Sequence, residues 1–193
     1  YSPESGENFP INMISNVNIE GEDEETTIID AMQTGAVIHI VDADNNIISG
    51  ITITGGLADG EFPYDRGGGM NLLNSNPTLT DVTIVYNTAE IHGGGMLLAA
   101  SHPILSNVTI EYNTAGDYGG GMRLFHSNPT LIHVTISNNT AGYGGGITLA
   151  SSNPILNHVM ITNNITNNNG GGIYSSNSNP ILNHVMITNN ITN

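Results

Sequence analysis

The feature that most constrains this chain is an internal repeat of 25–26 residues. The proline of a Ser-Asn-Pro turn (Ser-His-Pro in one copy) and a run of three glycines recur together, and both series step by 26, 26, 25 and 26 residues. Two independent markers with one period indicate a solenoid, whose repeats bury apolar side chains by stacking on their neighbours. The prolines are Pro77, Pro103, Pro129, Pro154 and Pro180, and the glycine runs are 67–69, 93–95, 119–121, 144–146 and 170–172.

Within each repeat the apolar residues alternate with polar ones, which is typical of strands. We expect Met70 and Leu72 to point inward from a first strand, Leu79 from a second, and Val82 and Ile84 from a third. The apolar-x-x-apolar-x-apolar pattern of the last three positions occurs seven times and predicts seven coils. These occurrences begin at Ile14, Ile48, Leu79, Leu105, Leu131, Leu156 and Leu182.

Stacked coils of this kind form three short parallel sheets around a core of aligned, similar side chains. The strong preference of parallel crossover connections for one hand makes the solenoid right-handed. The sequence therefore predicts an all-β, right-handed parallel β-helix that forms a single domain over residues 1–193. Residues 1–66 hold the N-terminal coils with longer insertions, and residues 67–193 hold the regular repeats.

Two columns of polar residues are expected at the corners of the coils. The first precedes Val82 and its equivalents and contains Asn, Asp, Gly and His, which are enriched in left-handed backbone, so we expect a corner between the second and third strands. The second closes the third strand and predicts a ladder of stacked asparagines. The first column is Asn16, Gly50, Asp81, Asn107, His133, His158 and His184; the second is Gly56, Asn87, Asn113, Asn139, Asn164 and Asn190.

The charge of the chain excludes several functions. Asp and Glu number 17 against two basic residues, Arg66 and Arg123, which gives a net charge of −15. This charge opposes binding to nucleic acids and to anionic membranes, and no apolar run of about 18 residues predicts insertion into a membrane. The chain has no cysteine, which excludes disulfides and thiol chemistry. We expect no cofactor, although surface carboxylates leave calcium binding open without giving it a location.

A candidate ligand-binding surface follows the residue that precedes each glycine run. The glycines leave a floor without side chains, and aromatic residues on its rim stack either on sugar rings or on each other. Arg123 projects outward from the neighbouring strand, and the insertion from Leu57 to Arg66 adds Phe62 and Tyr64 to the rim. The column itself is Arg66, His92, Tyr118, Tyr143 and Asn169.

Catalytic, metal-binding and ice-binding alternatives fit the sequence less well. Both arginines look isolated from acidic clusters, which argues against a lyase that cleaves acidic polysaccharides, and the outward acids fall in different columns rather than in the pair that a glycosidase needs. The stacked histidines of the first column are interpreted as bend residues rather than as metal ligands. An ice-binding face requires regular rows, and Met160 and Met186 break the outward threonine row of Thr52, Thr83, Thr109 and Thr135.

The run Ile136-Ser-Asn-Asn139-Thr-Ala, followed by Gly144-Gly-Gly-Ile147, resembles repeats of bacterial surface β-helices, including the polymorphic outer-membrane protein repeats of chlamydiae. Here isoleucine stands in every coil where those repeats carry an aromatic residue. The stretch from Tyr1 to Asp30 resembles the opening of secreted bacterial β-helix proteins that start with a domain of unknown function. These resemblances imply a pectin-lyase-like fold and an extracellular or cell-surface location in bacteria, but no activity.

We therefore expect a non-catalytic extracellular structural or adhesive solenoid that belongs to a longer surface protein or fibre. A β-helix that binds or degrades polysaccharides is the alternative, and an ice-binding solenoid is the third. Residues 152–166 recur identically at 178–192, and this last coil lacks the atypical cap that usually ends a solenoid. We expect self-association through the last coil or a chain that continues beyond it.

Overall fold

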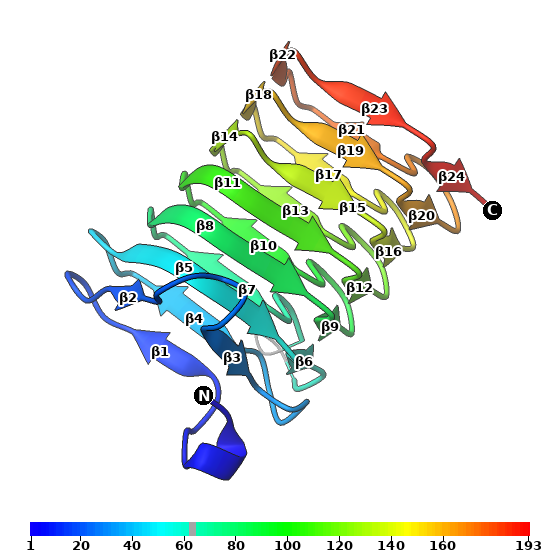
Figure 1. Cartoon of the computed structure of the whole chain (residues 1–193). Coiled ribbons are helices and arrows are strands. Elements are labelled where there is room, and N and C mark those ends of the chain that lie inside the picture. The colour runs from blue at the N-terminus through cyan, green and yellow to red at the C-terminus, as the bar shows by residue number, and fades with distance from the viewer. Residues whose placement is uncertain (62–64) are drawn as a thin grey trace.

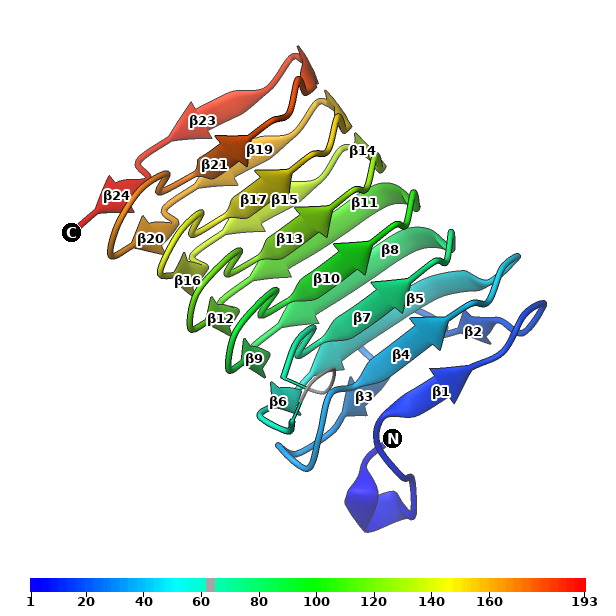
Figure 2. The same ribbon diagram turned by 180° about the vertical axis from the view of Figure 1, so that it is seen from behind.

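The chain forms a parallel β-solenoid whose coils succeed one another along a single axis (Figures 1 and 2). The computed structural model describes residues 1–61 and 65–193. A single 3-10 turn, η1 (Pro3–Ser5), precedes the first strand. Across these described ranges, no helix has the length and apolar character needed to span a membrane. The predicted all-β architecture with three parallel sheets is confirmed.

The first sheet, which we call sheet A, collects one short strand from each coil. Like side chains align between coils, so that Met70 pairs with Met96 and Met96 pairs with Met122, all fully buried. Alternate residues such as Arg123 point outward. The strands are β1 (Ile11–Met13), β4 (Ile38–Val41), β7 (Met70–Leu73), β10 (Met96–Ala99), β13 (Met122–Phe125), β17 (Ile147–Ala150) and β21 (Ile173–Ser176).

The second sheet, sheet B, is wider and buries the three inward positions that begin at Leu79 and its equivalents. Its middle coils contain one eight-residue strand each, and in the later coils this strand divides in two at the bend. The strands are β2 (Ile19–Glu20), β3 (Ile28–Asp30), β5 (Ile47–Thr54), β8 (Thr78–Val85), β11 (Ile104–Glu111), β14 (Thr130–Ile132), β15 (Thr135–Ser137), β18 (Ile155–Asn157), β19 (Met160–Thr162), β22 (Ile181–Asn183) and β23 (Met186–Thr188).

The third sheet, sheet C, consists of two-residue strands that lie beyond the asparagine column. The prediction that Val82 and Ile84 form the third strand was therefore wrong. Asp81 is left-handed, with a φ of 53°, but β8 pairs with β11 on both sides of it, so the bend restores inward alternation without a change of sheet. The strands are β6 (Leu57–Ala58), β9 (Thr88–Ala89), β12 (Thr114–Ala115), β16 (Thr140–Ala141), β20 (Ile165–Thr166) and β24 (Ile191–Thr192).

The bend column is left-handed in six coils, as the sequence predicts, but the first coil was misaligned. Its φ lies between 52° and 59° from Gly50 to His184. Asn16 is also left-handed, but it lies in the turn between β1 and β2 rather than at the bend of sheet B. Its partner is Asn45 in the equivalent turn of the next coil, whose Nδ2 donates to the Asn16 Oδ1 at 3.1 Å. The acidic segment 21–27, inserted between β2 and β3, displaces the later positions of this coil along the sequence.

The inward residues of the first coil confirm this correction. Ile19 pairs with Ile48, the first inward position of the next coil, rather than with the third. The third position is filled by Ile29, which is buried and pairs with Ile53. Ile14 is 68% exposed. The predicted pattern that began at Ile14 is therefore a chance match.

Three polar ladders join the coils at their corners. The predicted asparagine ladder is confirmed, because each Asn side chain from Asn113 to Asn190 accepts hydrogen bonds from the backbone N–H and the Nδ2 of its predecessor. A second ladder uses the serine of each Ser-Asn-Pro turn, where the Ser101 Oγ accepts from the Ser75 N–H at 3.1 Å. The next residue forms a third, in which the His102 Nδ1 replaces an asparagine oxygen as the acceptor.

The last coil leaves its inward side chains exposed. Leu182 and Ile187 continue columns that are fully buried in the middle coils, yet both are 46% exposed. The neighbouring strands β21 to β24 lie at the C-terminal end of the stack (Figure 1).

Candidate functional site

The predicted surface column lies at the turn from sheet C to sheet A. Parallel bridges join Arg66 to His92, His92 to Tyr118, and Tyr118 to Tyr143, which places the four residues in successive coils. The turn needs glycine next to this column, because a Cβ on Gly94 would lie 2.3 Å from the Thr114 carbonyl oxygen of the next coil. The glycine surface, which the sequence predicted to be free of side chains, is therefore a place where the backbones of successive coils come close together.

The aromatic rings of this surface stack on each other. Tyr118 and Tyr143 have centroids 5.1 Å apart and planes 20° apart, and Tyr174 lies 5.4 Å from Tyr143. His92 is 5.4 Å from Tyr118, and the Arg123 guanidinium carbon lies 4.4 Å from the centre of the Tyr118 ring, a cation–π contact. We call these five residues, together with Arg66, the arginine–tyrosine patch.

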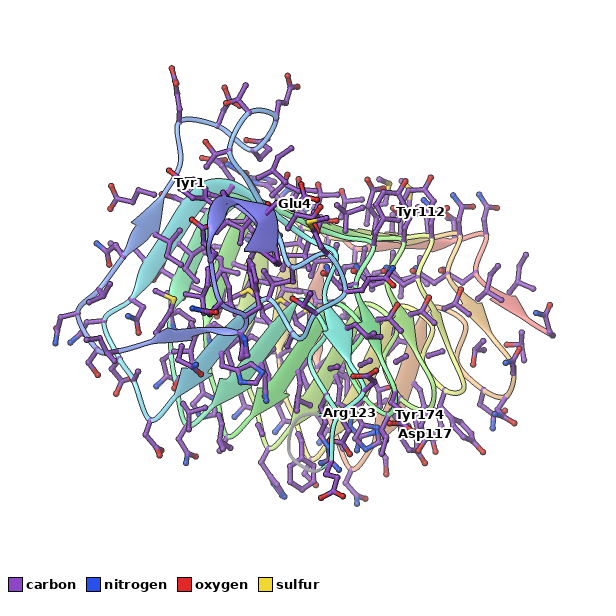
Figure 3. The ribbon with its side chains drawn as sticks, turned by 90° about the horizontal axis from the view of Figure 1, so that it is seen from below. Tyr1, Glu4, Tyr112, Asp117, Arg123 and Tyr174 are labelled. Atoms are coloured by element: carbon purple, nitrogen blue, oxygen red, sulfur yellow. The ribbon has the colours of Figure 1, made fainter. Side chains whose placement is uncertain are left out.

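Figure 3 shows Arg123, Tyr174 and Asp117 gathered on one side of the solenoid, with Tyr112 on the opposite side. Tyr174 was not predicted to belong to this surface. The signal that could have found it is register: Tyr174 pairs with Thr148, which pairs with Arg123, so the three share an outward column of sheet A. Phe62 and Tyr64, expected on the rim, lie outside the described residues.

The two arginines come together in the folded chain, which the sequence did not predict. Arg66, His92 and Arg123 line a hollow of about 130 Å³ whose apolar wall includes Leu97 and Phe125. They come from different coils, and only the register of sheet A with the preceding turn brings them to one face. Both arginines of a chain with a net charge of −15 therefore share this hollow.

A second hollow lies on the other side of Arg123. Its volume is about 180 Å³, and its wall includes Tyr118, Thr148, Tyr174 and Ser176. Aromatic rings and hydroxyl groups face the same space as the guanidinium. Arg123 therefore separates two small hollows that together extend along the outer face of sheet A.

Burial dominates the electrostatics of the patch. Burial, followed by the nearby charges of Arg123 and Arg66, lowers the pKa of His92 to about 4, so this imidazole is neutral at pH 7. Burial also raises the pKa of the Tyr118 hydroxyl and lowers the pKa of Arg123. Arg66 donates from Nε to the Asp65 Oδ1 at 2.8 Å.

Among the residues that the structure describes, two buried polar atoms of the patch have no hydrogen-bond partner, the Nδ1 of His92 and the Nη1 of Arg123. An unpaired buried donor costs free energy that a ligand oxygen would recover. Together with the half-buried tyrosine rings, this arrangement suits a ring-shaped ligand that carries hydroxyl or carboxylate oxygens.

The corner histidines, His133, His158 and His184, form a second stack on sheet B. Their ring centroids are 5.1 and 4.7 Å apart, and a ring nitrogen of His158 hydrogen-bonds the Asn157 side chain. In residues 1–61 and 65–193, no group of three or more His, Cys, Asp or Glu side chains is placed to hold a metal ion. The outward threonine row has the predicted register, with Met160 and Met186 continuing it after Thr135.

The parallel coils, the three sheets and the asparagine ladder define a parallel β-helix. The model of the family described as "Right handed beta helix region" matches residues 11–192, so the chain belongs to this family. The predicted fold, including its right hand, is confirmed. No curated protein and no solved structure gave a significant match.

Proposed function

We propose that the chain is a non-catalytic structural or adhesive solenoid of the bacterial cell exterior, and that it forms part of a longer surface protein or fibre. The observation that carries this proposal is the continuity of the polar ladders. Asn113, Asn139 and Asn164 make the same side-chain bonds to their neighbours, coil after coil. Such a stack holds its side faces in fixed positions along the axis, as a support for surface contacts requires.

The arrangement of the patch is consistent with a non-catalytic role. The Arg123 guanidinium lies over the Tyr118 ring, a contact that stabilises the stack of coils without any substrate. Asp65, the carboxylate beside Arg66, is already engaged as the acceptor from its Nε. The Arg123 guanidinium and the Asp65 carboxylate therefore each make a contact within the chain.

Incubation with polygalacturonate and with alginate, with and without calcium, tests the absence of lyase activity. We expect no increase in ultraviolet absorbance from unsaturated products. Formation of such products by the wild type and its loss in Arg123→Ala would overturn the non-catalytic proposal. Arg66→Ala serves as a second variant in case the first fails to fold.

Polysaccharide binding is the second candidate function, because the two hollows on either side of Arg123 combine aromatic walls with an unpaired guanidinium donor. Affinity electrophoresis in gels that contain acidic or neutral polysaccharides tests it. Retardation that is lost in Tyr174→Ala and kept in Tyr112→Asn supports binding at the patch. Tyr112 is a matched control, since it lies on the opposite side and stacks on Tyr86 at 5.3 Å. Unretarded migration of the wild type in every gel would refute this candidate.

A further inference from the structure

Charge is distributed very unevenly along the solenoid axis. All 17 acidic residues lie at or before Asp117, and both arginines lie at or before Arg123. Residues 124–193 contain no Asp, Glu, Lys or Arg. Because the coils stack in sequence order, the C-terminal coils form an uncharged end apart from histidine.

The outer face of sheet B is a broad, weakly charged surface. Thr, Ser, Asn, Ile, Val and Met side chains point outward from its strands, and Ile104, Ile155 and Met160 are exposed. From β8 to β23, its acidic residues are Asp81 and Glu111. Parallel strands in register make this face continuous over the coils, as Figure 1 shows for β8 to β23.

The two ends of this face differ in charge. The connection between β2 and β3 passes over the N-terminal end of the sheet (Figure 1), where the Thr52 hydroxyl donates to the Glu24 carbonyl oxygen at 2.6 Å. This connection and the end of β2 carry Glu20, Glu22, Asp23, Glu24 and Glu25. The corner histidines occupy the opposite end of the same face.

We propose that sheet B is an interface between two copies of this chain, packed face to face with their solenoid axes antiparallel. A two-fold axis parallel to the strands keeps each column opposite the same column of the other copy and reverses the order of the coils. With the coil of His133 at the axis, Asp81 faces His184 and Ile104 faces Ile155. The acidic β2–β3 connection then lies just beyond the last coil of the other copy.

Charge favours a second copy in this orientation over other arrangements. Parallel axes would bring the two acidic connections together, and like charges in contact oppose association. With antiparallel axes, each carboxylate of the face meets a neutral or basic side chain, since Glu111 faces Thr162 and Asp81 faces His184. The charge difference between the two ends of the face thus selects the antiparallel dimer.

The area of the face is sufficient for a specific dimer. Five coils at a spacing of about 4.8 Å and strands of eight residues at about 3.3 Å per residue give roughly 600 Å² per copy. The total of roughly 1,200 Å² lies at the lower limit of stable specific interfaces. We therefore expect a reversible dimer rather than a permanent one.

Sedimentation equilibrium of the full chain over a range of protein concentrations measures this association. Thr135→Glu places a carboxylate at the two-fold axis, opposite its own copy, and should weaken the dimer at least tenfold. Thr114→Glu adds the same charge to an exposed position of sheet C and should leave the dimer constant unchanged. Circular dichroism verifies that both variants fold.

An exchange of corner residues tests the antiparallel register itself. His184→Asp places an acid opposite Asp81 and should weaken the dimer, whereas the double variant Asp81→His with His184→Asp should restore it. Both positions are left-handed, and both residue types occur there naturally. The proposal is overturned if the chain is monomeric up to millimolar concentration or if the double variant shows no recovery. It is also overturned if Thr135→Glu leaves the association intact, because that result is expected of a dimer that forms through the last coil instead of sheet B.

Discussion

The asparagine ladder should be the most sensitive part of this solenoid, and Asn139→Ala tests it. The Asn139 Oδ1 accepts hydrogen bonds from the backbone N–H of Asn113 at 2.9 Å and from its Nδ2 at 3.1 Å. The Asn139 Nδ2 donates to the Ile110 carbonyl oxygen at 2.9 Å and to the Asn164 Oδ1 at 3.0 Å. Asn139 is fully buried, so water cannot replace these partners.

The loss of stability in Asn139→Ala depends on which of the hydrogen-bonding groups around residue 139 keep another partner. The Asn113 Nδ2 keeps its bond to the Ile84 carbonyl oxygen, and the Asn164 Oδ1 keeps its bond from the Asn139 N–H, but the Asn113 N–H loses its acceptor. A buried unsatisfied group costs about 1–3 kcal/mol, and each other lost hydrogen bond about 1 kcal/mol. With one unsatisfied N–H and three other lost bonds, the free energy of unfolding should fall by about 4–6 kcal/mol, a large part of the ~5–15 kcal/mol typical of a domain.

Urea unfolding followed by circular dichroism measures this change, with Asn153→Ala as the matched control. The Asn153 Oδ1 also accepts a backbone hydrogen bond from the next coil, at 2.6 Å from the Asn179 nitrogen, but this residue is exposed. Water replaces the lost acceptor there, so the loss should stay below about 1 kcal/mol. Equal losses in the two variants, or a loss of less than about 1 kcal/mol in Asn139→Ala, would show that the buried ladder does not stabilise the stack in this way.

Three further predictions concern the corners and the patch. Calorimetry with zinc should show no tight binding, and tight binding that disappears when the corner histidines are all replaced by Asn would contradict the bend interpretation. Gly94→Ala should destabilise the chain severely, because the new Cβ meets the Thr114 carbonyl oxygen, and a urea midpoint equal to that of the wild type would disprove it. The pKa of His92 is about 4 when folded and near 6.5 in an unfolded chain, so protons bind the unfolded state first and stability falls as the pH drops from about 6.5 towards 4. His92→Asn should reduce this loss in urea titrations at pH 7 and pH 5, and an unchanged loss would show that other groups dominate.

The conformation of Asp81 could be predicted from the sequence, whereas the neighbours of Arg123 could not. The left-handed conformation of Asp81 is a local property that its column of Asn, Gly and His makes visible. That the chain stays in sheet B after Asp81 depends on which strands pair on either side of it, and this was mispredicted. The meeting of Arg123 with Arg66 likewise depends on the register of one coil against another, which the spacing of the repeats alone does not show.

The coil, its period, the inward residues of the regular repeats and the asparagine ladder could all be predicted from the amino-acid sequence. Each of these recurs in the regular repeats, so one arrangement of stacked coils satisfies all copies at once, and Asn139 is placed by the same spacing as Asn113. Features that occur once become visible only in the folded chain. The acidic segment 21–27 shifts the first coil because a unique insertion has no second copy to reveal its register. Tyr174, Arg123 and Arg66 form one patch because side chains of different lengths reach across coils, and such contacts depend on three-dimensional positions rather than on period.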